Sequence, residues 1–261
     1  MMSKKRSDYY IQSIKRAIQI LNSFTLKEKE LSITELSKRL NLHKSTVHRI
    51  LVTLEDEALV EKNNINQKYH LAIKLLELGN IVKEQMEIST YTYPIMKELV
   101  QKVEESVYLN IIMDKKKVII EKCESSHDLR RVIHLGKSSP LYRGSSGKVL
   151  LAFLSDEEID EILQKEKLIP LTPNTITDPI KLKQKLKEIR LKKYAISLEE
   201  THIGTNSVAV PIFDYSGKCV ASLGISGPSN RFTKQKILQF VPLVKETAKK
   251  ISFSSGYQGI Y

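Results

Sequence analysis

Hydrophobic residues near the start of the chain recur every three or four positions, which is the spacing of an amphipathic helix. Two such stripes follow one another and consist of Ile33, Leu36, Ser37 and Leu40, then Val47, Ile50, Leu51 and Leu54. Asn41 and Leu42 separate the two stripes and predict a tight turn. An earlier stripe, with Ser13 as its predicted N-cap, consists of Ile14, Ala17, Ile18, Leu21 and Phe24. The pattern therefore predicts three helices around one small core.

Polar residues crowd the beginning of the third of these helices, on the face that the apolar stripe leaves outside. They are His43, Lys44, Ser45, Thr46, His48 and Arg49. Side chains of this kind can reach phosphates and base edges, so the face is typical of a helix that reads DNA. The alternative is an ordinary helical hairpin whose charges form a solvated face, with Thr46 as a cap and His48 packed against the first helix.

Two short predicted strands, 59–62 and 68–71, flank a polar turn at 63–67 and indicate a β-hairpin. Three helices followed by a hairpin form a winged helix-turn-helix, in which the hairpin lies along the DNA backbone or the minor groove. The candidate DNA contacts are Lys44, Ser45, Thr46, His48, Arg49, Lys62, Asn64 and Lys68. We expect Arg49 to read guanine or clamp a phosphate, and Lys44 and the wing residues to attract the backbone.

Apolar residues recur at helical spacing from residue 72 to about residue 87, which predicts a linker helix. The pattern leaves open whether this helix pairs subunits or belongs to a core. Another helix is predicted at 93–104, entered through Pro94, whose missing N–H costs nothing in a first turn. The expected domains are a winged helix-turn-helix at 1–72, a linker helix at 73–92 and a C-terminal domain at 93–261.

The C-terminal domain alternates between predicted strands and helices. Strands are expected at 106–113, 117–123, 131–135, 195–198, 207–213 and 218–226. Helices are expected at 146–154, 156–165, 180–193 and 233–252. Two antiparallel groups of strands with helices between them indicate an α+β sensor-type domain, not a doubly wound nucleotide fold.

The segment 142–151 places small residues just before a helix with an apolar face. Unpaired backbone N–H groups and the helix dipole favour an anion or a carbonyl oxygen there, and the hydroxyls of Ser145 and Ser146 add hydrogen bonds. A phosphate-binding Walker loop is disfavoured, because Tyr142 stands where it needs glycine and Val149 where it needs Ser or Thr. A capped helix start without a ligand is the alternative.

A second polar cluster at 197–207 brings Glu199, Glu200 and His202 to the entrance of a strand. Acid/base chemistry, a metal site and nucleophilic catalysis by Ser145 with His202 are all weakly indicated, because no second ligand cluster or base partner accompanies them. Solvated loop charges explain the cluster better. We therefore expect no metal, no cofactor and no catalytic residue, and hence no enzyme.

The composition agrees with a polyanionic partner. The formal net charge is +12 and the pI about 9.4, which suits nucleic acid or an acidic membrane surface. Cys123 and Cys219 lie too far apart in sequence for a Cys-x-x-Cys pair, so a zinc site or a disulfide framework is not expected. No signal-peptide core and no run of 18 apolar residues is present, and we expect a cytoplasmic protein without membrane contact.

Taken together, these segments resemble the IclR family of bacterial transcriptional regulators along nearly the whole chain. The matching pieces are 13–21, 42–51, 68–71, 145–152, 197–204, 207–214 and 221–228. The resemblance implies an N-terminal winged helix-turn-helix, a C-terminal GAF-like effector-binding domain with an antiparallel sheet, and a homodimer or homotetramer on palindromic operators. Thr201 and His202 depart from the usual family pattern, as do Tyr194 and Ser145.

Carried over position by position, the resemblance also implies an effector pocket. Its residues would be Ser145, Ser146, Ser197, Thr205, Ser207, Gly224 and Ser226. Family effectors are small organic acids, which agrees with an anion-binding loop. The expected function is a DNA-binding regulator, with repression favoured, under the control of such an acid. The alternative is a metabolite-sensing or enzymatic domain whose basic N-terminal module docks to a protein or a membrane.

Overall fold

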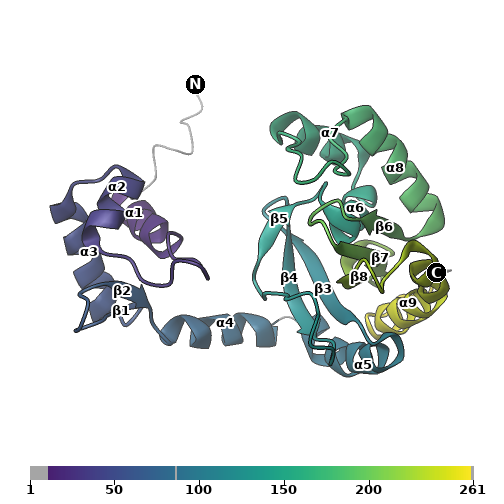
Figure 1. Cartoon of the computed structure of the whole chain (residues 1–261), viewed down its shortest axis with the longest axis horizontal. Coiled ribbons are helices and arrows are strands. Elements are labelled where there is room, and N and C mark those ends of the chain that lie inside the picture. Colours follow the sequence, from purple (N-terminus) through teal and green to yellow (C-terminus); the bar gives the residue numbers. More distant parts are fainter. Residues whose placement is uncertain (1–10, 86, 260–261) are drawn as a thin grey trace. The chain divides into compact units, whose positions relative to one another are not determined.

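The structure, a computed structural model, describes residues 11–85 and 87–259. Residues 1–10, where no signal peptide was expected, and Met86, inside the predicted linker helix, lie outside this description. The chain divides into two compact units, residues 1–85 and 86–261. The predicted linker, 73–92, is thereby shared between the units, with one helix in each (Figure 1).

The N-terminal unit consists of three helices, a two-stranded hairpin and a fourth helix. In order these are α1 (Gln12–Leu21), α2 (Ile33–Leu40), α3 (Lys44–Asp56), β1 (Val60–Lys62), β2 (Tyr69–Leu71) and α4 (Lys74–Gln85). Its core contains Ile20, Phe24, Leu31, Leu36, Val47, Leu51, Leu54, Val60 and Tyr69. The expected winged helix-turn-helix is confirmed, but the predicted core positions Ile14 and Ile18 are wrong: both are about half exposed, and α1 turns Ile20 into the core together with Ala17 and Leu21.

Local capping sets the geometry of the helix pair α2 and α3. Ser32 and Glu35 form a capping box at the start of α2. Asn41 ends α2 in the left-handed conformation (φ 53°), and the Ser37 hydroxyl donates to the carbonyl of Leu42 at 2.6 Å. The predicted N-cap Ser13 is wrong, because the backbone already becomes helical at Gln12 and α1 has no side-chain cap.

The C-terminal unit is built on one six-stranded antiparallel sheet, ordered β5-β4-β3-β8-β7-β6. The strands are β3 (Ser106–Met113), β4 (Lys116–Cys123), β5 (Ser138–Pro140), β6 (Ala195–Leu198), β7 (Thr205–Phe213) and β8 (Cys219–Pro228). The two groups of strands that the sequence indicated are thus parts of a single sheet, because the central strand β8 pairs with β3 on one side and β7 on the other.

Helices cover both faces of this sheet (Figure 1). On one face lie α5 (Glu87–Val103) and α9 (Lys234–Ser254), which bury residues such as Leu99 and Val244 against Leu223. On the other face lies α6 (Gly144–Ala152), backed by α7 (Asp156–Lys165) and α8 (Pro179–Lys192). The α+β fold class is therefore confirmed.

Two predicted elements of this unit are wrong. The segment 131–135 forms no strand; it is a loop that buries Ile133 against Tyr108 and Ile119. Pro94 does not open a helix at 93 but lies inside α5, which begins at Glu87. The described residues include no helix long and apolar enough to cross a membrane.

Candidate functional site

The predicted reading face of α3 is open to solvent. Lys44, Ser45, His48 and Arg49 are exposed and Thr46 is partly exposed, whereas Val47 on the opposite side is fully buried. The packing role considered for His48 is therefore not what the structure shows. The first turn of α3 carries no acidic residue and no side-chain cap, so its free N–H groups and positive dipole end favour a phosphate.

The three predicted contact residues of the wing differ in their exposure and in their neighbours. Asn64 is exposed in the turn, and the Lys62 ammonium lies 5.8 Å from the centre of the Tyr69 ring. The Lys68 ammonium is paired with the Glu35 carboxylate at 3.1 Å. Since Glu35 also belongs to the α2 capping box, with its pKa lowered to about 2 by hydrogen bonds from Ser32 and Lys68, part of the Lys68 charge is already compensated.

A polar strip runs across the sheet face beneath α6. Because side chains alternate along a strand, Ser222, Gly224 and Ser226 of β8 share this face, and Leu223 and Ile225 point to the opposite core. Strand pairing places Tyr108 and Asn110 of β3 beside them and Ser207 of β7 on the other side, with Ser197 of β6 next in line. The predicted site residues on strands therefore share one face, with Thr205 at its end.

The beginning of α6 lies directly on this strip. The Ser145 hydroxyl donates to the Ser207 hydroxyl at 2.8 Å. A Cβ at Gly224 would lie 2.6 Å from Cε2 of Tyr108 and 2.7 Å from Oγ of Ser146. Glycine is thus required at 224 for the helix and the tyrosine to approach the sheet. The structure brings Ser145, Ser146, Ser207, Gly224 and Ser226 together as predicted.

Four buried polar atoms of this unit have no hydrogen-bond partner within the described protein. They are Asn110 Oδ1, Ser146 Oγ, Ser222 Oγ and Ser226 Oγ. Each residue is at most 1% exposed. All four belong to the polar strip or the helix start above it. Buried polar atoms are normally paired, so this concentration indicates a site that polar groups of another molecule can complete.

Cationic side chains surround the same helix start. The Lys117 ammonium donates to the carbonyl of Arg143 at 3.2 Å, and Arg131 lies 5.6 Å from the centre of the Tyr108 ring. Burial, aided by the neighbouring positive charges, lowers the pKa of Lys117 to about 7. Burial and the charges of Arg131 and Lys137 also lower the pKa of His202. An anion at this place would relieve the mutual repulsion of these cations.

One buried ion pair was not predicted. The Lys148 side chain is fully buried in α6, and its ammonium donates to both carboxylate oxygens of Glu200, at 2.5 and 2.7 Å. The Glu200 backbone carbonyl accepts from the Thr175 hydroxyl at 2.7 Å. The pair holds the loop after β6 against α6, which gives Glu200 a structural role in place of acid/base chemistry. The Ser145 hydroxyl donates its hydrogen bond to the Ser207 hydroxyl and not to His202, so the considered dyad with His202 gains no support.

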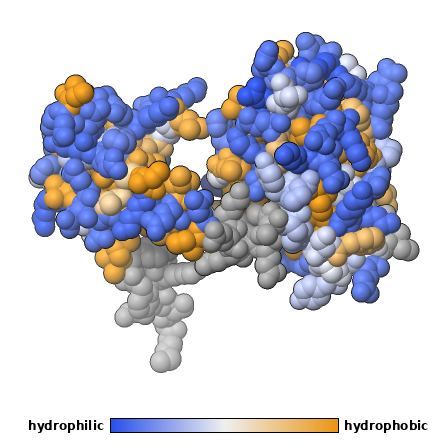
Figure 2. Space-filling view, turned by 90° about the horizontal axis from the view of Figure 1, so that it is seen from below, coloured by the Kyte–Doolittle hydropathy of each residue, from blue (hydrophilic) through white to orange (hydrophobic). Residues whose placement is uncertain are grey.

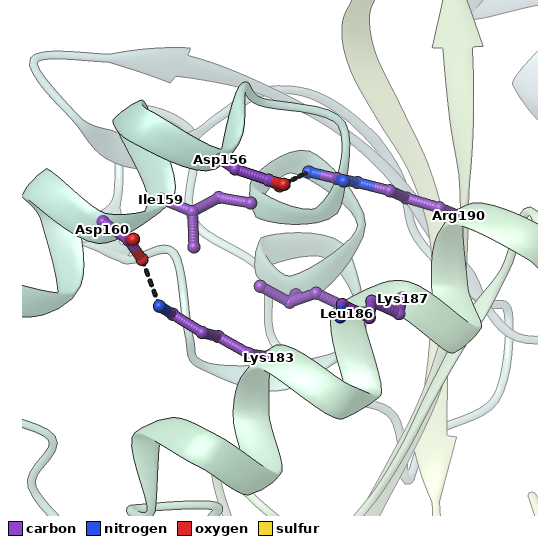
Figure 3. Close-up of a pocket in the computed structure, with 7 residues that line it drawn as sticks. All are labelled: Asp156, Ile159, Asp160, Lys183, Leu186, Lys187 and Arg190. Carbon is purple, nitrogen blue, oxygen red and sulfur yellow. Dashed lines mark hydrogen bonds and ion pairs between the residues drawn. The ribbon is translucent and has the colours of Figure 1, made fainter.

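A small groove between α7 and α8, about 190 Å³ in volume, is a different kind of feature (Figure 3). Its charged groups already pair across the groove, Asp156 with Arg190 at 2.8 Å and Asp160 with Lys183. These two pairs join the helices across the groove, and of its charged lining residues Lys187 is the one that forms no ion pair in the part of the chain that the structure describes. Within the described residues no group of three or more His, Cys, Asp or Glu side chains could hold a metal ion.

Sequence reasoning missed Tyr108, Asn110 and Ser222 at the polar strip, and Lys117 and Arg131 at its edge. The signal was present for the first three. Polar residues recur at every second position in 106–110, and polar or small residues do so in 222–226, which indicates one non-apolar face on each strand. That the two faces meet depends on the pairing of β3 with β8, more than a hundred residues apart in sequence.

A winged helix-turn-helix in one unit and an α+β sheet domain in the other are the architecture of a DNA-binding transcriptional regulator. Residues 13–64 match the family profile "IclR helix-turn-helix domain", and residues 81–253 match "Bacterial transcriptional regulator IclR C-terminal". The chain belongs to the IclR family of bacterial transcriptional regulators. The alternative of a sensing or enzymatic domain with a docking module is not supported, because the matched family is one of regulators, not of enzymes.

Individual relatives align over almost the full chain. The HTH-type transcriptional regulator KdgR of Escherichia coli (strain K12) is 33% identical over 247 residues, which are 95% of this chain and 94% of that protein. The IclR structure from Thermotoga maritima is 33% identical, covers 95% of this chain and all of that chain, and has a TM-score of 0.76. An IclR homologue from Microbacterium hydrocarbonoxydans complexed with 4-hydroxybenzoate shares the fold, with 23% identity, coverage of 92% and 98%, and a TM-score of 0.80.

Proposed function

We propose that this regulator is a cytoplasmic repressor that binds a palindromic operator as a homodimer or homotetramer and responds to a small organic acid. A symmetric assembly presents two copies of α3 to two half-sites, which is why operator symmetry mirrors subunit symmetry. An assembly seated on such a site keeps other proteins off the same duplex, which favours repression. The effector would bind at the polar strip beneath α6.

Exposed hydrophobic residues on the N-terminal unit support self-association. More than half of the side-chain surface is exposed at Ile11, the N-cap of α1, and at Ile14 and Ile18 within α1. On α4, Leu76, Leu78, Ile81 and Val82 are about half exposed. Figure 2 shows hydrophobic side chains among the hydrophilic surface of this unit. Apolar residues on adjacent helical turns gain stability when a second copy covers them.

The unpartnered atoms beneath α6 are the observation that carries the effector assignment. Ser146, Ser222, Ser226 and Asn110 supply polar atoms without partners, and α6 and the cations around Lys117 supply positive potential. A molecule with one carboxylate and additional oxygen atoms fits this site, because the carboxylate suits the positive potential and the other oxygen atoms can bond to the unpartnered polar atoms. The 4-hydroxybenzoate bound by the homologue is likewise a small carboxylate with a hydroxyl. The effector shifts DNA binding only if it favours one of two arrangements of the protein.

A thermal-shift screen with keto acids, sugar acids and aromatic carboxylates tests the effector assignment, because a ligand of the folded state raises the melting temperature. The positive compound is then titrated against Ser226→Ala. A matched control is Ser254→Ala, an exposed serine of α9. We expect Ser226→Ala to weaken binding and Ser254→Ala to leave it unchanged. Equal affinity in both variants would contradict a site on the polar strip.

DNA contacts are tested by anisotropy titrations with an operator selected by the full chain from random duplexes. Lys44→Ala should weaken binding to all sequences and reduce the salt dependence, because Lys44 contacts phosphate. Arg49→Ala should in addition relax the preference for one base pair by roughly 1–3 kcal/mol. Lys192→Ala, an exposed charge on α8, is the control. Equal loss on operator and random duplex would refute base reading by Arg49.

A further inference from the structure

The turn at the tip of the wing is held rigidly by its own polar groups. The Asn63 N–H donates to the carbonyl of Lys68 and the Gln67 N–H to the carbonyl of Asn63, both at 2.8 Å. The side chains of Asn63 and Asn66 accept from the backbone N–H groups of Ile65 and Lys68, both at 2.9 Å. Four hydrogen bonds within six residues leave this turn little freedom.

A carboxylate from outside the hairpin fastens the same turn. Glu30 accepts from Nδ2 of Asn63 at 2.9 Å and from Nδ2 of Asn66 at 2.6 Å. These two bonds lower the pKa of Glu30, so the carboxylate is charged at neutral pH. The adjacent residue Leu31 pairs with Tyr69 of β2 through two backbone hydrogen bonds. The segment before α2 therefore holds the hairpin and its turn in place through Glu30 and Leu31.

This rigid turn presents a large hydrophobic side chain to water. Ile65 is 95% exposed, more than any other large hydrophobic residue of the described chain. It is flanked by Asn64 and Asn66, and its side chain has no packing role in the unit. An aliphatic side chain held in water by an ordered turn gains free energy when another surface covers it.

We propose that Ile65 is an apolar wedge that enters the minor groove beside the bases read by α3, and that Glu30 is the positioning residue that holds it there. Isoleucine is among the residues that insert between base steps and bend the duplex. The occupant is DNA because the hairpin belongs to the same helix-turn-helix unit as the exposed polar face of α3. Lys62 at the end of β1 and Lys68 just before β2 flank the turn with positive charge, which Glu35 compensates in part at Lys68. The wedge is expected to favour easily unstacked steps such as TA.

The test uses the full chain and a selected operator that carries 2-aminopurine at successive positions of the flanking minor groove. With the unsubstituted protein, fluorescence should rise at one step, where the base unstacks. With Ile65→Ala that rise should vanish and the Kd should weaken roughly tenfold, the equivalent of losing the burial of one aliphatic side chain. Ile65→Met should retain both effects. Ile180→Ala, with a 70% exposed isoleucine on α8, is the matched control and should change neither.

Glu30→Gln tests the positioning role, because an amide cannot accept from both asparagines as the carboxylate does. The fluorescence rise should shrink although Ile65 is intact, and the melting temperature should change little because Glu30 lies at the surface. Unchanged fluorescence with Ile65→Ala would overturn the wedge, whether or not affinity falls. A loss of affinity that is equal on operator and random duplex, without any fluorescence change, would identify a backbone contact and likewise overturn it.

Discussion

Removal of the Glu200 carboxylate should destabilise the C-terminal unit more than any exposed charge substitution. The Lys148 side chain has no exposed surface, and Glu200 is 12% exposed. Besides Glu200, the Lys148 ammonium has the carbonyl of Ile196 within reach, at 3.4 Å. Glu200→Ala therefore leaves a buried positive charge with one long hydrogen bond. Breaking a buried pair in this way typically costs about 3–5 kcal/mol.

The deprotonation of Lys148 sets an independent upper limit on the stability that Glu200→Ala can lose, and this limit has a similar magnitude. Lys148 can escape the charged state by releasing its proton, and burial already lowers its pKa from the ordinary value of 10.5 against the opposing effect of Glu200. Neutralising such a lysine at pH 7 costs about 1.4 kcal/mol per pH unit, or roughly 5 kcal/mol in all. The loss cannot exceed this value by much, because deprotonation is always available. It is comparable with the whole stability of many domains.

The pH dependence has a definite sign. When folded Glu200→Ala protein keeps Lys148 neutral, the unfolded chain binds one more proton, so the free energy of unfolding rises with pH until the ordinary lysine pKa is reached. In this variant the free energy of unfolding is therefore highest at high pH, and it decreases as pH falls toward the lowered pKa of Lys148. Part of the loss at pH 7 should therefore be recovered at pH 9, with a slope of up to about 1.4 kcal/mol per pH unit.

Urea unfolding followed by far-UV circular dichroism measures the effect, since the chain has no tryptophan for fluorescence. Glu188→Ala is the control, because Glu188 forms only exposed pairs with Lys185 and Lys192 and should cost less than about 1 kcal/mol. The double variant Lys148→Met with Glu200→Leu should recover most of the stability. If Glu200→Ala cost no more than the control at both pH values, the buried-charge reasoning would be refuted.

Three further outcomes are expected. Gly224→Ala places a methyl group against the Tyr108 ring and should abolish the effector's thermal shift while operator binding persists; a retained shift would contradict the assigned site. Gly79→Ala, whose methyl meets nothing within 4 Å on exposed α4, should raise stability by up to about 1 kcal/mol in urea unfolding, and a loss would show that this glycine is needed. Effector affinity, measured calorimetrically from pH 6 to 8.5, should fall as Lys117 loses its proton around pH 7, and Lys117→Met should flatten that profile.

The N-terminal unit could be predicted closely because its signals are local. The apolar spacing of α2 and the turn at Asn41 act within a few residues of one another, whereas the cap Ser32 was not predicted and the predicted cap Ser13 was wrong. The C-terminal unit was harder. The apolar segment 131–135 reads as a strand, yet only Ile133 is buried and the backbone forms a loop. Pro94 is typical of a first helical turn, yet it lies inside α5, which begins at Glu87.

In the candidate site, too, residues with local sequence signals could be predicted, and residues that depend on the fold could not. The serines at the start of α6 could be found from their position before an apolar helix, since that relation is local. For Asn110 and Ser222 the alternation along each strand indicates a polar face, but that they are neighbours follows only from the register of β3 with β8. The Lys148–Glu200 pair is also invisible in sequence. A lysine in an apolar helix and a glutamate in a polar loop each have an ordinary exposed interpretation until the fold buries one of them.

Satisfied and unsatisfied polar groups divide the C-terminal unit into structural and functional parts. Away from the polar strip, the buried side-chain polar groups among the described residues of this unit are paired, for example Glu105 with Arg231 at 2.6 Å, Lys148 with Glu200, and the Asn206 amide with the carbonyl of Phe232 at 2.9 Å. The four polar atoms without partners lie along the strip or on the start of α6 above it. A fold that pairs its other buried groups bears an energetic cost at this one place. An effector that supplies the missing partners gains that free energy on binding, which makes the strip the place where a small acid can bias the protein between two arrangements.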